Sequence, residues 1–159
     1  MGFPLAFIEI LLVLICSPIL FLVYYQLNKN TLRTSFPEKS IFIHFLVVLG
    51  IVSLGILLSN LVRTCCGITL SYLFTDSITI KQFASLLWVT PYENELSTTI
   101  CASFLTLALN LIIIYNILRL YKSKSKYLVA EKNYSLYTTL IFNVPIIIYL
   151  FSQVILLIP

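Results

Sequence analysis

Four long apolar runs, separated by short polar segments, constrain the fold of this chain more than any other feature. They cover residues 5–27, 41–62, 96–118 and 134–158, and each holds 22 to 25 residues. A helix of about 22 residues is about 33 Å long, enough to cross a hydrocarbon core of about 30 Å. Because lipid offers the backbone no hydrogen-bond partners, such runs cross membranes as helices. We therefore expect a single all-α domain, a polytopic transmembrane helical bundle with four spans.

The composition excludes a soluble domain and indicates the lipid bilayer as the main partner. Hydrophobic residues make up 60% of the chain and charged residues 10%, and the mean hydropathy is +1.02. Soluble domains carry about 25% charged residues. The net charge is only +4, and the basic residues lie beside apolar runs. This pattern favours orientation at a membrane surface and argues against nucleic-acid binding.

The first run contains one charge, Glu9, close to its start. Because no carboxylate lies in the middle of a span, the sequence argues against an ion-coupled carrier. Ser17 and Pro18 fall in the middle of the same run, where the missing N–H and the proline ring should kink the helix.

Small and polar residues inside the other runs predict contacts between helices. Gly50, Gly55 and Ser59 form a small-residue face that permits close approach of a neighbouring helix. Asn110 lies well inside the third run and needs a hydrogen-bond partner, so we expect it to join two helices. His44 lies near the loop end of the second run. It is expected at the membrane interface, with a proton or ligand site as the alternative.

The segment at 63–95 is predicted to be an outer loop. Its two apolar pieces, residues 68–74 and 83–89, are each too short to span a membrane. An additional, atypical span at about 65–90 is the alternative.

The distribution of basic residues predicts the orientation. The loop at 28–40 holds three Lys and Arg residues, the loop at 119–133 holds five, and the longer segment at 63–95 holds two. The positive-inside rule therefore places both short loops in the cytoplasm and the middle loop and both termini outside.

The loop at 119–133 contains the most prominent cluster of charge. Such a basic cluster attracts anionic lipid or the acidic face of a cytoplasmic protein, while the alternative is an anchor for topology alone. The predicted contact residues are Arg119, Lys122, Lys124, Lys126 and Lys132.

The sequence contains no pattern typical of an enzyme, so we expect no catalytic residues, no cofactor and no metal site. His44 has no acidic companion nearby, and no glycine-rich phosphate loop is present. A disulfide between Cys101 and either Cys65 or Cys66 is conceivable in an oxidising exterior, with free thiols as the alternative.

Two parts of the chain resemble a known receptor family. The stretch "NLIIIYNILRLYKSKSKYLVAEKNYSLYTTLIFNVPIIIYL", with Arg119 ending a helix and Pro145 inside the next, resembles the fifth helix, third cytoplasmic loop and sixth helix of nematode serpentine chemoreceptors. The opening is also similar, with Ser17-Pro18 in the first helix and "LNKNTLRTSF" leading into "IFIHFLVVLGI". Together these parts cover roughly two thirds of the chain.

The resemblance implies a plasma-membrane receptor of the G-protein-coupled type. A small-molecule ligand would bind among the outer halves of the helices, and a cytoplasmic protein would meet the basic loops. Counterparts of the third, fourth and seventh helices are not recognisable, which implies a truncated or divergent member, incomplete for signalling. One alternative is a structural or assembly subunit of an organellar respiratory complex in an inner membrane. A small-molecule carrier working as an oligomer is the other.

Overall fold

The computed structural model describes residues 2–31, 38–73, 96–124 and 133–156, and all of its regular elements in these ranges are helical. The prediction of an all-α helical bundle is therefore confirmed. The elements are α1 (Gly2–Ile15), α2 (Ser17–Gln26), the short π-helical segment η1 (Leu27–Thr31), α3 (Glu38–Leu73), α5 (Leu96–Lys124) and α6 (Tyr134–Leu156).

Three of these helices, α3, α5 and α6, are long and apolar enough to cross a membrane. The helices α1 and α2 pass the same test together but are bent by 63° at their junction, so they make a fourth span if the pair is one broken helix. The bend confirms the kink predicted at Ser17-Pro18. Pro18 lies in the first turn of α2, where a helix needs no N–H, and its ring prevents α1 from continuing.

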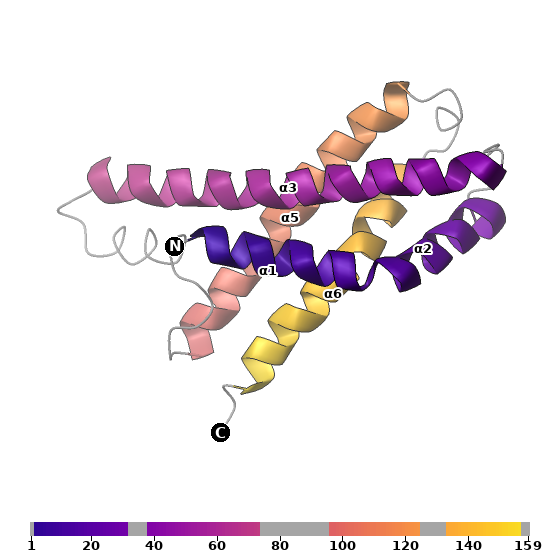
Figure 1. The fold of residues 1–159 in the computed structure, drawn as a ribbon. Coiled ribbons are helices and arrows are strands. Elements are labelled where there is room, and N and C mark those ends of the chain that lie inside the picture. The colour runs from indigo at the N-terminus through magenta and orange to yellow at the C-terminus, as the bar shows by residue number, and fades with distance from the viewer. Residues whose placement is uncertain (1, 32–37, 74–95, 125–132, 157–159) are drawn as a thin grey trace.

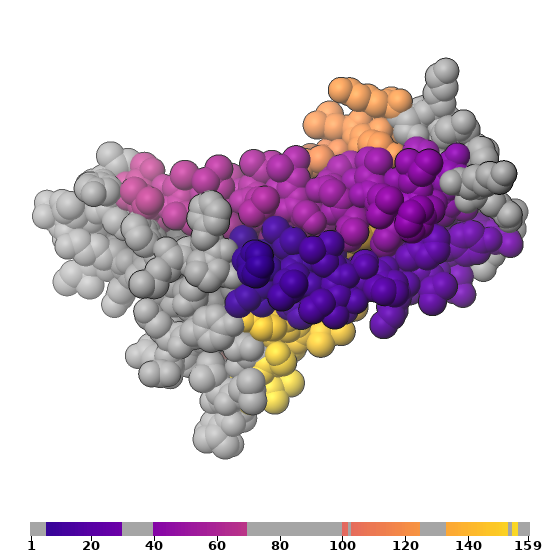
Figure 2. Space-filling view, in the orientation of Figure 1, coloured from indigo at the N-terminus to yellow at the C-terminus, as the bar shows by residue number. Residues whose placement is uncertain are grey.

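The helices pack in two directions. Helices α5 and α6 run side by side, and α3 and the α1–α2 pair cross them obliquely (Figure 1). Helix α1 lies along α3 on one face of the molecule (Figure 2). Aromatic rings fill the core near α2, where Tyr24 contacts both Phe45 and Phe142.

Large apolar side chains cover the outside, including Ile15 and Phe104, each 67% exposed. Such a surface fits contact with the lipid bilayer.

The close approach predicted for the small-residue face is present at one of its two glycines. A Cβ atom added to Gly55 would lie 2.6 Å from Cγ1 of Ile114 in α5, too close for any side chain. At Gly50 nothing lies within 4 Å of the same position. Gly55 is therefore a point of close approach between α3 and α5.

Two helices extend beyond the apolar runs. Helix α3 continues past residue 62 to Leu73, so Arg63 belongs to the bundle and not to a loop. Helix α5 continues to Lys124. A run-length criterion ends a span at the first charge, whereas a helix continues as long as no residue breaks its backbone hydrogen bonds. The alternative span at 65–90 begins inside α3, and its part beyond residue 73 lies outside the described residues.

Candidate functional site

Polar side chains from three helices lie together in the interior of the bundle, where the sequence predicted helix contacts for only two of them, Ser59 and Asn110. All are 5% exposed or less. We call this group the polar layer, and its members are Glu9 from α1, Ser59, Asn60 and Arg63 from α3, and Thr106 and Asn110 from α5.

Helical spacing brings these side chains to the same place. On α3, Ser59 and Arg63 are four residues apart, so both project from the face that buries Val52 and Ile56. Thr106 and Asn110 have the same spacing on α5. The interior face of α3 is therefore apolar over most of its length and polar over about one turn. On α5 the buried positions from Ser103 to Asn110 are polar, and those that follow, Ile114 and Leu118, are apolar.

The carboxylate of Glu9 joins α1 to the other two helices. Its Oε2 atom accepts a hydrogen bond from Asn60 Nδ2 and another from Asn110 Nδ2, each 3.3 Å long. The second oxygen, Oε1, is buried without a hydrogen-bond partner. The site therefore has a free acceptor on a buried carboxylate.

The guanidinium of Arg63 contacts the Asn60 amide at its oxygen, whereas Glu9 contacts the same amide at its nitrogen. Its Nη1 donates to Thr106 Oγ1 at 2.6 Å, its Nη2 donates to Asn60 Oδ1 at 3.1 Å, and its Nε is buried without a partner. The described residues show no direct ion pair between Glu9 and Arg63, so the Asn60 amide links the two charges. Because an isolated charge inside a membrane is costly, each of the two charges depends on the other being present.

The prediction for Asn110 is confirmed, because it joins α5 to both α1 and α3. Its Oδ1 faces the hydroxyl of Ser59, which has one proton to donate either there or to the carbonyl of Ile56. Its amide nitrogen is then directed at Glu9. Asn110 thereby completes a hydrogen-bonded link across three helices.

A second polar group lies toward the basic end of α5. The hydroxyls of Tyr24 and Tyr134 are 2.7 Å apart and both residues are fully buried. His44 shares a hydrogen bond with the hydroxyl of Tyr121 in α5. His44 is only partly buried, as its predicted position near the interface implies, and its bond ties α3 to the last turns of α5.

We expect Tyr24→Phe to lower the free energy of unfolding by about 1–2 kcal/mol, because the buried hydroxyl of Tyr134 loses its partner. Reversible unfolding in mixtures of detergent and SDS measures the difference. The double variant Tyr24→Phe/Tyr134→Phe should lose less than the sum of the two single variants, since no hydroxyl is left unpaired. Tyr137→Phe, at an exposed position on α6, is the control and should change little.

The predicted basic contact residues are only partly described. Arg119 and Lys124 are exposed and Lys122 is half-buried, all on the last turns of α5. Positive side chains there are favoured by the partial negative charge at the C-terminus of a helix. Lys126 and Lys132 lie outside the described residues.

Neither the cysteines nor the metal-ligating residue types form a further site in the part of the chain that the structure describes. Cys65, Cys66 and Cys101 are exposed free thiols, and Cys16 is also free. The disulfide from Cys101 to Cys65 or Cys66 is therefore not formed in this structure, and the pairing stays a prediction. Within the described part of the chain, no group of three His, Cys, Asp or Glu residues could hold a metal ion.

The sequence interpretation missed the two charged members of the polar layer. Glu9 lies near the start of its run and not in its middle, and Arg63 falls in the segment 63–95, which is predicted to be an outer loop. One signal was available: Asn60 and Arg63 are one helical turn apart and continue the face of Ile56. Extending the buried face of Ile56 by this one turn predicts a buried arginine, which needs an acidic partner from another helix.

Comparison with known proteins identifies no relative. No protein-family model matches the chain, and neither a curated protein nor a solved structure is significantly similar to it. Function is therefore inferred from the polar layer and from the basic end of α5.

Proposed function

We propose that this chain is a chemosensory receptor of the G-protein-coupled type, incomplete relative to seven-helix members, in the plasma membrane. It binds a small molecule among the outer halves of its helices and contacts a protein in the cytoplasm. One observation carries the proposal: α5 bears the polar layer at Thr106 and Asn110 and exposed basic residues at its other end. A single helix therefore connects the buried site with the predicted cytoplasmic surface.

The polar layer has the properties of a site that a ligand can rearrange. It holds together α1, α3 and α5, and the Glu9–Arg63 link passes through one amide rather than through a direct ion pair. Glu9 Oε1 and Arg63 Nε are buried and unpartnered. A ligand that changes how these groups are satisfied favours one arrangement of the three helices over another, which is what a receptor requires.

The basic end of α5 supports a partner with an acidic face. Arg119 and Lys124 are exposed there, and the positive-inside rule predicts that this end lies in the cytoplasm. His44 and Tyr121 connect the same end of α5 to α3. A displacement of α5 at the polar layer is therefore transmitted to the surface that carries these charges.

A photo-crosslinking residue at Ser123, between Lys122 and Lys124, tests the proposal in cells. We expect crosslinks to a heterotrimeric G-protein subunit. The triple variant Arg119→Glu/Lys122→Glu/Lys124→Glu should abolish them, because it reverses the charge of the contact surface. The matched control Arg119→Lys/Lys122→Arg/Lys124→Arg keeps the charge and should retain them.

Two results would contradict the receptor proposal. The first is stoichiometric co-purification with respiratory subunits, which would favour the structural or assembly role. The second is an epitope tag placed after Lys124 that antibodies reach in intact cells. Such a tag would show that the basic end of α5 faces away from the cytoplasm.

A further inference from the structure

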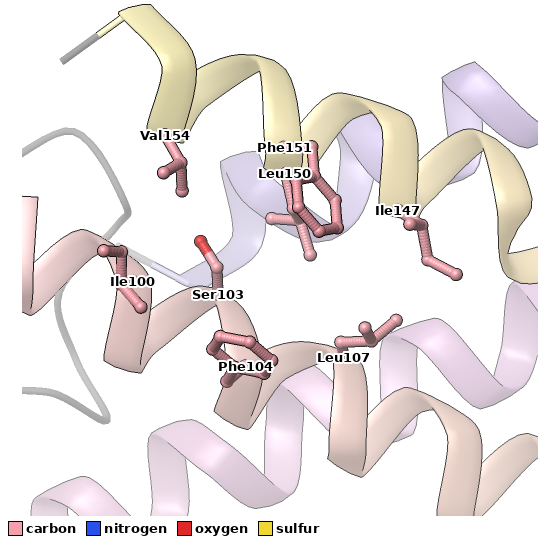
Figure 3. Close-up of a pocket in the computed structure, with 8 residues that line it drawn as sticks. All are labelled: Ile100, Ser103, Phe104, Leu107, Ile147, Leu150, Phe151 and Val154. Carbon is pink, nitrogen blue, oxygen red and sulfur yellow. The ribbon is translucent and has the colours of Figure 1, made fainter. Parts of the chain in front are cut away.

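An apolar cavity lies between α5 and α6, at the end of these helices away from the basic residues (Figure 3). Its volume is about 170 Å³. No charged side chain is among its lining residues, which are Ile100, Ser103, Phe104 and Leu107 of α5 and Ile147, Leu150, Phe151 and Val154 of α6.

The single polar group of the cavity is the hydroxyl of Ser103. Figure 3 shows its oxygen directed from α5 into the space below α6. Ser103 is 7% exposed, and its Oγ has no hydrogen-bond partner. A serine on an apolar helix ordinarily bonds to the carbonyl one turn earlier, as Ser53 does with Leu49. A buried hydroxyl without such a bond has a donor available for a bound molecule.

The size and lining of the cavity define what it accommodates. An engineered cavity of about 150 Å³ lined by apolar side chains binds benzene. The space between α5 and α6 has a similar volume of 170 Å³ but is open on one side, where Phe104 and Phe151 are 67% and 60% exposed, and it accepts one ring with a short substituent. A charged molecule is excluded, because the lining contains no compensating charge. A carbonyl oxygen matches Ser103, since it accepts one hydrogen bond and needs no second partner.

We propose that the cavity between α5 and α6 binds a small uncharged molecule with an apolar ring and one hydrogen-bond acceptor, held by Ser103. The cavity adjoins the polar layer, because Thr106, which binds Arg63, lies between the lining positions 103 and 107 on α5. A bound molecule acts on the helix segment that positions Thr106. That the molecule is a signal rests on the proposed function, whereas its binding does not.

Two ligands of nearly equal shape test the hydrogen bond. Acetophenone carries a carbonyl oxygen where α-methylstyrene carries a CH₂ group, so the first accepts a hydrogen bond and the second does not. Binding is measured by calorimetry on the full chain in lipid nanodiscs, with empty nanodiscs subtracted to remove partition into lipid. Because α-methylstyrene is the more apolar of the two and is less well solvated by water, the quantity compared between variants is the ratio of the two affinities, acetophenone over α-methylstyrene. We expect the Ser103 hydroxyl to raise this ratio about five-fold, the effect of one neutral hydrogen bond.

Three variants locate the binding site. Ser103→Ala should lower this ratio about five-fold and leave the affinity for α-methylstyrene unchanged. Ser103→Leu should fill the cavity and weaken binding of both ligands. Ser53→Ala is the matched control: it removes a serine hydroxyl on α3 away from the cavity and should leave the ratio unchanged.

An unchanged affinity ratio in Ser103→Ala or no binding above empty nanodiscs would each overturn the proposal. A cavity occupied by a lipid acyl chain gives the last of these results. Failure of the site is distinguishable from failure of the receptor function. In the first case crosslinking to a G protein at Ser123 persists, and in the second the ligands bind but no such crosslink forms.

Discussion

Replacing Arg63 with methionine is expected to lower the free energy of unfolding by about 3–5 kcal/mol. The substitution keeps a long side chain but removes Arg63, the one buried cation in the part of the chain that the structure describes, and with it the compensation of Glu9. It also removes the hydrogen bonds to Thr106 and Asn60. Removing one partner of a buried charge pair has a large effect because the other charge remains in a medium of low polarity. Unfolding in mixtures of detergent and SDS measures the change.

The double variant separates this explanation from simple loss of packing. Glu9→Gln should also destabilise the chain, because it leaves Arg63 without compensation. The combination Glu9→Gln/Arg63→Met should cost much less than the sum of the two single variants, since neither charge then remains. Arg119→Met, which removes an exposed arginine from α5, is the control and should change stability by less than about 0.5 kcal/mol. Additive effects of the two single variants would contradict a link between the charges.

The properties that the sequence predicted depend on each helix separately. Apolar runs long enough to cross a bilayer predicted the all-α bundle, and Pro18 predicted the bend between α1 and α2. Asn110 predicted a contact between helices because a buried amide must be satisfied, but its partners Glu9 and Ser59 could not be chosen without the packing. Local chemistry therefore gave the need for a contact, and the fold supplied the partner.

The unpredicted parts of the site depend on residues far apart in the chain. Tyr24 and Tyr134 are separated by 110 positions, and neither carries a local signal that distinguishes it from an interfacial tyrosine. The cavity at Ser103 arises from how α5 and α6 leave space between them, and no single helix determines that space. Such features require the relative placement of helices, which hydrophobic patterns within one helix do not specify.

Replacing Gly55 with alanine is expected to lower the free energy of unfolding by about 1–3 kcal/mol, the usual effect of overpacking. The new Cβ would lie 2.6 Å from Cγ1 of Ile114. Ile114 is fully buried, and its Cγ1 atom lies close to the backbone of Ile114 itself. Helices α3 and α5 must therefore separate. Gly50→Ala is a matched control on the same helix, because its Cβ enters open space. It should leave stability unchanged or raise it by up to about 1 kcal/mol through higher helix propensity.

Trimming the opposing side chain tests whether this clash is the cause. Ile114→Ala removes the atom that the new Cβ would meet, so it should destabilise the Gly55→Ala variant less than it destabilises the wild-type chain. We expect the same contact to set the geometry of the polar layer. Ser59 lies one helical turn beyond Gly55 on α3, and its bond to Asn110 spans the gap that Gly55 keeps narrow. If Gly55→Ala separates the helices there, Ser59→Ala should have a smaller effect in the Gly55→Ala variant than in the wild-type chain. Equal effects would show that the glycine does not control the polar layer.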